Sequence, residues 1–454
     1  MMRIRTTLLL LIALVAAPMF AARGSANFTT IAVIGDSYGA GVVSNSLNVN
    51  HQVHSWPAVI AQQTGSKDFQ QPLVSFPGIG PELVLVDIIH FPPTILPASS
   101  SNGVPINLNL PRPYNNLSVP GANVGDVTTL TGKEPVTGTA SNFAQFILRG
   151  LGTEVQQAIA LKPTFVLIWI GGNDALGAFL GGTPALLTPV DTFRTNYNKM
   201  LDQLVAGAPN AGMIVGNIPT NAAALPYGAT VPPVIINPAT QKPLLIGGNP
   251  VPLIADLGGG NIGPLPTGSL VLLGAASKIA TGFGIPPQLA SAPPFNQFPN
   301  AGKPLLDSDV LTPTELTAIQ TRVNDFNTVI QQSAQAHDVP VADIKGLFDR
   351  IAAGLHVGPV VLNGSFITGG AFGLDGFHMS DMGYTLFADE YIKTINNAYG
   401  TSIPIAPLTN FLQNNILTTS GAVFMDGMPW EMSDEAAQQI HDFAPRVVRR
   451  HAIH

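Results

Sequence analysis

The stretch TTIAVIGDSYGAGVV, residues 29 to 43, joins a short apolar run to a turn of small residues. The run Ile31 to Ile34 is continuous rather than alternating, which is typical of a strand covered on both faces in a parallel sheet. The turn GDSYG, residues 35 to 39, follows it directly. Ligands in open α/β sheets bind beyond the carboxyl ends of the strands, so this stretch predicts a first strand and a candidate site at Ser37.

Three further apolar runs and two helical patterns extend this picture. The runs span residues 165–170, 213–215 and 339–341, and residues 142–161 and 312–336 carry apolar side chains at helical spacing. The second helical pattern opens with a capping box, Thr312 to Glu315, with proline in its first turn. Alternating strands and helices predict an α/β fold, built on a parallel sheet with right-handed crossovers.

The composition limits the function. Of 454 residues, 46% are hydrophobic and only 10% are charged, and the net charge is −7. Nucleic-acid binding needs a basic footprint, so we expect no nucleic-acid partner. The chain has no cysteine, which excludes disulfides, cysteine-based metal sites and a cysteine nucleophile.

Glycine and proline, 46 and 40 residues, divide the chain into segments. They concentrate in residues 91–119 and 226–311, which we interpret as insertions into one domain of residues 27–400. The second is long enough to be a functional insertion or a lid. Residues 401–454 form a predicted C-terminal extension that includes a polar helix candidate at 433–450.

The first 26 residues are typical of a secretory signal peptide. Arg3 and Arg5 precede an apolar run from Leu8 to Ala17, and small residues up to Ala26 offer cleavage points. A membrane anchor is the alternative, but a span needs about 20 apolar residues and this run is shorter. We therefore expect an exported protein with no integral membrane span in the mature chain.

A serine nucleophile needs an imidazole base, which a carboxylate orients. The stretch GLDGFHMSDMGY places Asp375 three residues before His378, so that one turn can join the carboxylate to the ring. Asn173 follows the second apolar run, where its side-chain amide could stabilise an oxyanion, and Gly121 could offer a backbone N–H. Taken singly, these two residues are better explained as a turn glycine and a helix-capping asparagine.

Together, these residues resemble the sequence blocks of the SGNH hydrolases, the GDSL-type lipases and esterases. The stretches IGDSYGAG, NLSVPGA, WIGGNDAL and DGFHMSDMGY occur in the family's order. The resemblance implies that Ser37 is the nucleophile and that Asp375 and His378 complete the catalytic triad. It further implies an oxyanion hole made by the backbone N–H groups of Ser37 and Gly121 and the side chain of Asn173. No metal or organic cofactor is implied.

The resemblance, over roughly residues 30–395, also sets the expected fold and activity. It implies a three-layer α/β/α flavodoxin-like fold with about five parallel strands, and a serine hydrolase of esters. The leader adds export, and the apolar insertions favour a carboxylesterase or lipase that acts on a hydrophobic ester. The alternatives are a catalytically silent binding protein on this fold, and an acetyl-sugar esterase or lysophospholipase. The sequence departs from the family at Tyr38, where leucine is more usual.

Other readings of the Ser37 turn fit less well. The letters G-x-S-x-G match the nucleophile elbow of α/β-hydrolases, but that elbow follows several strands and Ser37 follows the first. A dinucleotide fingerprint fails because Ser44 stands where its third glycine belongs, and a phosphate-binding P-loop lacks its Gly-Lys ending. A metal site of Asp375, His378 and Asp381 lacks a second convincing histidine.

Overall fold

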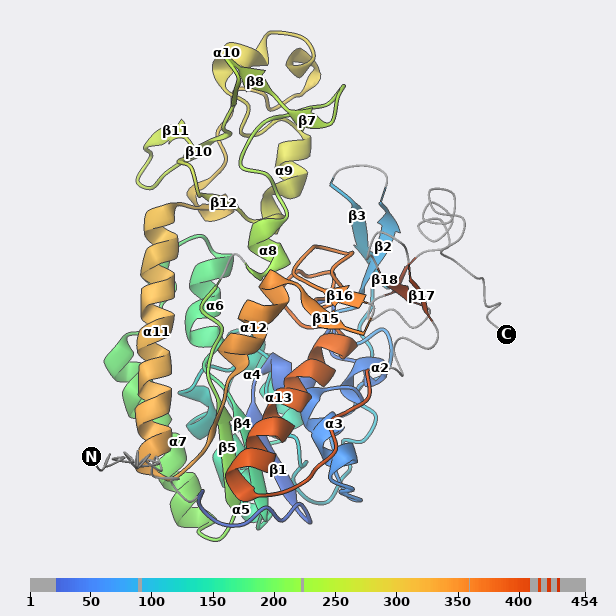
Figure 1. Ribbon diagram of the computed structural model, residues 1–454, viewed down its shortest axis with the longest axis vertical. Coiled ribbons are helices and arrows are strands. Elements are labelled where there is room, and N and C mark those ends of the chain that lie inside the picture. The colour runs from blue at the N-terminus through green and yellow to red at the C-terminus, as the bar shows by residue number, and fades with distance from the viewer. Residues whose placement is uncertain are drawn as a thin grey trace, which may run out of the picture.

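Four parallel strands form a sheet in the lower half of the molecule in Figure 1. The computed structural model describes residues 22–88, 92–221, 224–358 and 360–408, and the backbone of three short strands beyond them. The sheet has the order β1-β4-β5-β14, and every neighbouring pair is parallel. Its strands are β1 (Ile31–Gly35), β4 (Phe165–Trp169), β5 (Gly212–Gly216) and β14 (Val341–Ala342).

Residues 115–119 extend this sheet beyond β1. Val33 N–H donates to Asn115 O (2.8 Å), Leu117 N–H to Val33 O (3.1 Å) and Val119 N–H to Gly35 O (3.0 Å). With this segment counted as the second in chain order, the sheet has the flavodoxin-like order 2-1-3-4-5. The last residues of the expected insertion 91–119 therefore lie along the edge of the sheet.

Glycines in the turn after β1 permit this pairing. A Cβ at position 39 would lie 2.2 Å from the Ser118 hydroxyl oxygen, and one at position 35 would lie 2.9 Å from it. Larger residues at either position would push the segment away from β1. The glycines of the opening stretch thus serve close packing of the backbone.

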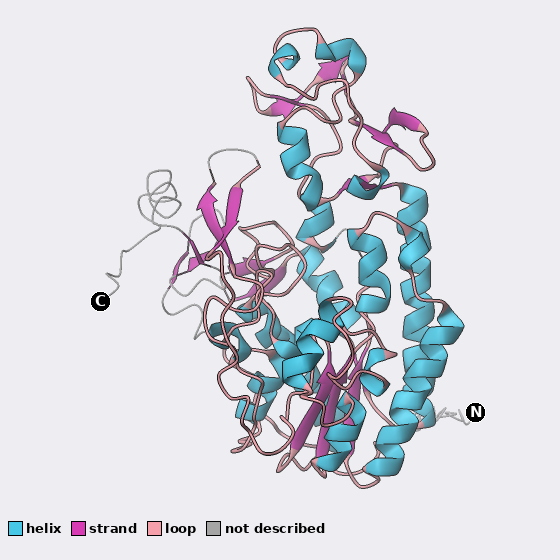
Figure 2. Cartoon of the chain, turned by 180° about the vertical axis from the view of Figure 1, so that it is seen from behind, coloured by secondary structure: helices cyan, strands magenta, loops and turns pink. Residues whose placement is uncertain are grey.

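Helices cover both faces of the sheet (Figure 2). Ala32 and Ile34 belong to one apolar cluster, and Ile31 and Val33 belong to another on the opposite face. The first cluster includes side chains of α4 (Thr139–Ile147), α5 (Glu154–Ala160), α6 (Asn173–Leu180), α7 (Val190–Gly207) and α11 (Pro313–Ala336). The second includes side chains of α1 (Ser37–Ala40), α3 (Trp56–Gln63), α12 (Ile344–Ala353) and α13 (Asp381–Tyr399). This arrangement confirms the three-layer α/β/α fold.

One of the two predicted helices is interrupted in the structure, and the other is confirmed. Residues 142–161 do not form one helix, because the chain breaks between α4 and α5. Arg149, Gly150 and Gly152 there have φ of 55°, 70° and 129°, which no α-helix accommodates. The capping box of α11 is confirmed: Thr312 N–H donates to Glu315 Oε2 (2.8 Å), and Glu315 N–H to Thr312 Oγ1 (3.4 Å).

The segment 226–311 packs around an apolar cluster of its own at the top of Figure 1. Buried members of the cluster include Leu253, Ala255, Val271 and Phe295. Its helices are α8 (Pro226–Ala229), α9 (Ala276–Ala280) and α10 (Pro287–Ala290). Its strands are β6 (Ile236–Asn237), β7 (Lys242–Pro243), β8 (Leu245–Ile246), β9 (Asn249–Pro250), β10 (Ile254–Asp256), β11 (Ile262–Pro264), β12 (Leu270–Val271) and β13 (Val310–Leu311).

The remaining elements are short. They are α2 (Val49–Gln52), β2 (Leu83–Asp87), β3 (Thr94–Pro97), β15 (Leu355–Val357), β16 (Val360–Leu362), β17 (Asn415–Leu417), β18 (Val423–Met425) and β19 (Glu431–Met432). β19 pairs with β2 in parallel. The helix expected at 433–450 and the first 21 residues of the predicted leader lie outside the described residues.

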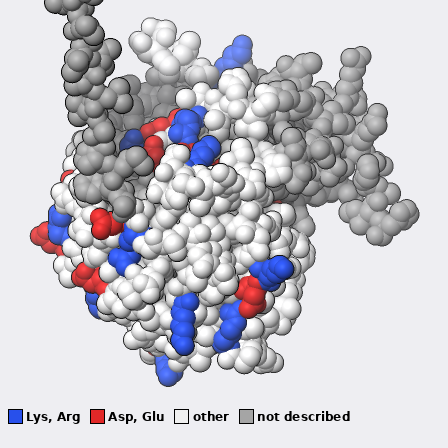
Figure 3. Space-filling model, turned by 60° about the horizontal axis from the view of Figure 1, so that its bottom comes forward, with Lys and Arg blue, Asp and Glu red and all other residues white. Residues whose placement is uncertain are grey.

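Charges are sparse on the surface of the fold. On the face in Figure 3, isolated Lys and Arg side chains alternate with Asp and Glu on a largely uncharged surface. In the part of the chain that the structure describes, no helix combines the length and apolar character needed to cross a bilayer.

Candidate active site

Ser37 occupies the first position of α1, immediately after β1. The preceding Asp36 caps this helical turn by accepting a hydrogen bond from Tyr38 N–H (3.0 Å). Gly41 ends the turn with φ +83°, a left-handed conformation that favours glycine. Among the described residues, Ser37 N–H has no acceptor. The strand-to-helix turn thus presents a hydroxyl and a free N–H donor together.

Gly121 and Asn173 supply the other two expected oxyanion donors. Gly121 has φ +85°, and a Cβ there would lie 2.9 Å from the Thr139 side chain, so the position requires glycine. Its N–H also has no acceptor among the described residues. Asn173 is the first residue of α6, and its Nδ2 donates to Ala122 O (2.8 Å). This bond fixes the amide and leaves its second N–H available.

Asp375 and His378 form a buried pair in the loop before α13. His378 Nδ1 lies 2.8 Å from Asp375 Oδ2. The carboxylate also accepts hydrogen bonds from the N–H groups of Phe377 (3.0 Å), His378 (2.9 Å) and Asn45 (2.6 Å). Burial opposes the charge of Asp375, but His378 and these donors lower its pKa below the ordinary value. An ionised carboxylate therefore orients the imidazole.

One wide cavity is lined by most of the candidate site residues. Ser37, Gly121, Asn173 and His378 line it, and its volume is about 570 Å³. His378 Nε2 is buried and has no hydrogen-bond partner among the described residues. Asp375 lies behind the ring, where it contacts Nδ1. Four of the five residues chosen from the sequence thus share a cavity, and the fifth supports one of them.

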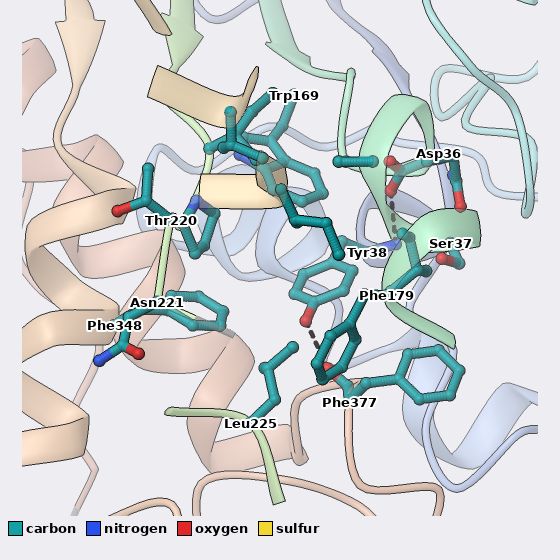
Figure 4. A pocket seen from close by; sticks show the side chains of 18 residues that line it. Asp36, Ser37, Tyr38, Trp169, Phe179, Thr220, Asn221, Leu225, Phe348 and Phe377 are labelled. Atoms are coloured by element: carbon teal, nitrogen blue, oxygen red, sulfur yellow. Dashed lines mark hydrogen bonds between the residues drawn. The ribbon is translucent and has the colours of Figure 1, made fainter. Parts of the chain in front are cut away.

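A narrow cavity of about 90 Å³ adjoins this site (Figure 4). Ser37, Asn173, Leu176 and Phe377 line both cavities, whereas His378 and Gly121 line only the wide one. The other lining residues of the narrow cavity are mostly apolar and come from the turn after β1, from β4, α6, α11 and α12, and from the loop after β5. They include Trp169, Phe179, Ile218, Leu225, Val323 and Phe348.

Buried acids lie around the nucleophile turn. Glu154 Oε2 accepts from Gly35 N–H (3.0 Å), and Asp174 Oδ2 accepts from Val124 N–H (3.0 Å). Burial raises the pKa of Asp36 to about 8, that of Asp174 to about 6 and that of Glu154 well above its ordinary value. Burial therefore favours the uncharged forms of Asp36 and Glu154, which limits negative charge around the Ser37 turn.

Sequence reasoning missed two contributors to the site. Asn45, with φ 64°, turns its N–H to Asp375, and the hydroxyl of Tyr38 donates to Phe377 O. A left-handed asparagine in the tripeptide Ser44-Asn45-Ser46 is a detectable signal of a turn, although not of its target.

The metal alternative has no geometric support in the described chain. Asp381, its third member, bonds to His51 instead. Within the described ranges, no group of three or more His, Asp or Glu side chains is arranged to hold a metal ion.

A family model matches most of the chain. The family model described as GDSL-like Lipase/Acylhydrolase matches residues 31–391. This span includes all five residues discussed above. Among curated proteins, no sequence matches the chain.

Several solved structures are distantly similar to the chain. Phospholipase A1 from Streptomyces albidoflavus NA297 is 14% identical, with 83% of this chain and 100% of that chain covered and a TM-score of 0.34. The extracellular lipase from Streptomyces rimosus is 14% identical, with 81% and 98% covered and a TM-score of 0.33. The Clostridium thermocellum family 3 carbohydrate esterase is 12% identical, with 82% and 96% covered and a TM-score of 0.30.

Proposed function

Because this chain belongs to the GDSL-like lipase/acylhydrolase family and is therefore a hydrolase of ester bonds, we propose that it works by two-step acyl transfer with Ser37 as the nucleophile. His378 Nε2 takes the proton of the Ser37 hydroxyl as Oγ attacks the ester carbonyl carbon. The tetrahedral intermediate collapses, His378 returns the proton to the leaving alkoxide, and an acyl-serine ester remains. Water then attacks this ester by the same route and releases the acid.

The observation that carries this proposal is the shared cavity of Ser37, Gly121, Asn173 and His378. The unpartnered Nε2 can accept a proton, since Nδ1 is engaged by Asp375. The free N–H groups of Ser37 and Gly121 and the second amide N–H of Asn173 are the donors for the oxyanion. Each such donor contributes about 10²–10³ in rate in comparable enzymes.

The two cavities support an orientation for the substrate. The leaving alcohol receives its proton from His378, which lines only the wide cavity, so the alcohol lies there. The acyl chain then extends into the narrow apolar cavity on the other side of Ser37. An apolar acyl pocket favours a carboxylesterase or lipase-type activity on esters of hydrophobic acids.

Export belongs to the same proposal. Residues 1–26 carry the charge and apolar pattern of a signal peptide. Arg23 N–H donates to Asp338 O (2.9 Å), and Ser25 pairs with Ala211. Cleavage at the end of the leader, among the small residues up to Ala26, would release these contacts and leave the domain of residues 27–400.

The test is covalent labelling of the serine. A fluorophosphonate should label the purified protein at Ser37, and Ser37→Ala and His378→Ala should each remove nearly all hydrolysis of p-nitrophenyl esters. The control is His337→Ala, which removes a surface histidine paired with Asp202; it should retain activity. An unlabelled wild-type protein would favour a silent binding function, and substantial activity in a folded Ser37→Ala variant would refute the triad.

A further inference from the structure

A second buried histidine lies between two carboxylates close to the candidate active site. His51 Nδ1 lies 2.9 Å from Asp381 Oδ1 and 3.1 Å from Asp381 Oδ2. Its Nε2 lies 2.9 Å from Glu82 Oε1. His51 is 6% exposed, Glu82 0% and Asp381 8%. The proposed acyl transfer uses none of these three side chains.

The geometry favours a charged His51. A neutral imidazole donates from one nitrogen and accepts at the other, whereas ionised carboxylates only accept. Both ring nitrogens of His51 face carboxyl oxygens, so an imidazolium that donates from both nitrogens matches two ionised carboxylates. Burial lowers the pKa of His51, but Asp381 and Glu82 together outweigh it and raise the pKa to about 10. Asp381 is also the first residue of α13, where the helix dipole favours its negative charge.

This cluster joins the segment 44–52 to the loop that carries the acid and the base. Asp381 lies three residues after His378, and His51 is in α2. At the other end of the segment, Asn45 N–H donates to Asp375 Oδ2 (2.6 Å), and Leu374 N–H donates to the Ser44 hydroxyl (3.0 Å).

Glu82 fixes the opposite side of the segment. Its Oε2 accepts from Asn48 Nδ2 (3.1 Å), and the next residue, Leu83, donates its N–H to Ser44 O (3.0 Å). The segment is thus held between Glu82 and the Asp375–His378 loop, and the charge of His51 attracts both sides.

We propose that His51 is a positioning residue for the reaction: as an imidazolium between Glu82 and Asp381, it holds Asn45 against Asp375 and so fixes the orientation of His378. This inference rests on the proposed function. According to this proposal, the active site depends on a second histidine that does not contact the substrate. The charged form exists below about pH 10 and is lost as the pH rises through that value.

Two variants separate the charge of His51 from simple packing. His51→Gln removes the charge, and a misplaced catalytic pair should lower kcat about ten- to hundredfold with little change in KM. Glu82→Gln removes one of the two carboxylates that attract the imidazolium, so kcat at pH 8 should fall in the same direction as in His51→Gln but by less. In wild type, kcat should fall above about pH 10, and in Glu82→Gln this fall should begin at a lower pH, because one of the groups that raise the His51 pKa is gone. His337→Gln, which breaks the surface pair with Asp202, should match wild type.

Two measurements do not depend on ester hydrolysis. In ¹⁵N NMR spectra of histidine-labelled wild type at pH 8, both ring nitrogens of His51 should be protonated. In hydrogen exchange followed by mass spectrometry, peptides covering residues 44–52 and 372–381 should exchange faster in His51→Gln than in wild type.

The outcomes distinguish the two proposals. If wild type neither hydrolyses esters nor labels at Ser37, the proposed function fails, while NMR and hydrogen exchange still decide whether a charged His51 holds the loop. An unprotonated His51 nitrogen at pH 8 would overturn the inference. So would a folded His51→Gln with wild-type kcat, or an alkaline loss that persists unchanged in Glu82→Gln.

Discussion

Tyr38, next to the candidate nucleophile, contacts the loop of the candidate base. Its hydroxyl donates to Phe377 O, and its ring centroid lies 5.7 Å from that of His378. The family usually has leucine here, and leucine could fill the space but could not donate this bond. In this chain, a residue of the nucleophile turn therefore restrains the peptide that precedes His378.

Tyr38→Phe removes only the hydroxyl. We expect a three- to tenfold fall in kcat with KM nearly unchanged, since about 1 kcal/mol of hydrogen bonding no longer holds the loop. Steady-state kinetics on a p-nitrophenyl ester would measure this effect. Tyr391→Phe is the matched control, because the Tyr391 hydroxyl also donates to a buried carbonyl, that of Ile168 (2.7 Å), within the sheet. Tyr391→Phe should lower the free energy of unfolding by a similar amount but keep the wild-type kcat. Equal kcat values in Tyr38→Phe and Tyr391→Phe would contradict the role of Tyr38.

The residues that sequence reasoning identified and those it missed differ in how they act. The roles proposed for Ser37, Asn173, Asp375 and His378 belong to side chains whose chemistry can be read from the sequence. Asn45 contributes a backbone N–H, which any residue other than proline possesses. The partners of His51 are 31 and 330 positions away in the sequence. They could therefore not be predicted from the polar stretch that contains His51.

At the scale of elements, the narrow cavity depends on helices that are distant in sequence. Its walls come from α6, α11 and α12, with Thr220 from the loop after β5. In Figure 4, Thr220 lies on the side of the cavity opposite Ser37. The space available to an acyl chain is therefore set by how these elements pack.

Thr220→Trp should shorten the acyl chain that the enzyme prefers. Each methylene buried contributes about 0.8 kcal/mol, or roughly fourfold in kcat/KM, until the cavity is full. A series of p-nitrophenyl esters should show kcat/KM rising with chain length to an optimum in wild type, and an optimum at shorter chains in Thr220→Trp. Thr328→Trp, on the exposed side of α11, should keep the wild-type optimum. An unchanged optimum in Thr220→Trp would place the acyl chain elsewhere.

Strands and helix caps could be predicted from short patterns, but the break between α4 and α5 could not. The apolar period continues through residues 142–161, and it hides the left-handed Arg149 and Gly150. The edge segment 115–119 was also missed, because its pairing with β1 depends on Gly39 and Ser118 fitting together across the chain. Both errors concern backbone conformation set by tertiary contacts.

At the scale of the whole molecule, buried acids make folding depend on pH. Burial raises the pKa of Asp36 to about 8, from an ordinary value of 3.8. The folded protein therefore binds a proton that the unfolded chain releases between those values. By proton linkage, the free energy of unfolding falls as the pH rises from about 4 to about 8. Asp174, with its pKa raised to about 6, adds to the same trend over a narrower range.

Asp36→Asn should weaken this dependence. The amide oxygen of Asn can still cap Tyr38 N–H, but the residue no longer titrates. Urea unfolding at pH 5 and pH 8 should show a smaller loss of stability in the variant, by on the order of 1 kcal/mol or more, because one pKa unit corresponds to about 1.4 kcal/mol. Equal losses in wild type and variant would show that Asp36 titrates normally in the folded protein.

The fold class was predictable because it depends on the order of strands and helices, which the sequence displays. The role of the segment 226–311 was not, since its contacts with the rest of the chain are non-local. Tyr227 N–H, near its start, donates to Gly376 O (2.9 Å), between the acid and the base. A Cβ at Gly376 would lie 2.9 Å from Tyr227 N, so this contact requires glycine.

The distribution of the site along the chain has a consequence for biosynthesis. Ser37 follows β1, the first strand of the sheet, whereas the Asp375–His378 loop directly precedes α13. A ribosome that has already translated Ser37, Gly121 and Asn173 still has about two hundred codons to read before the base appears. On the proposed mechanism, nascent and prematurely terminated chains therefore carry the proposed nucleophile without its base. Ester hydrolysis by that mechanism begins only after nearly the whole domain has been synthesised and folded.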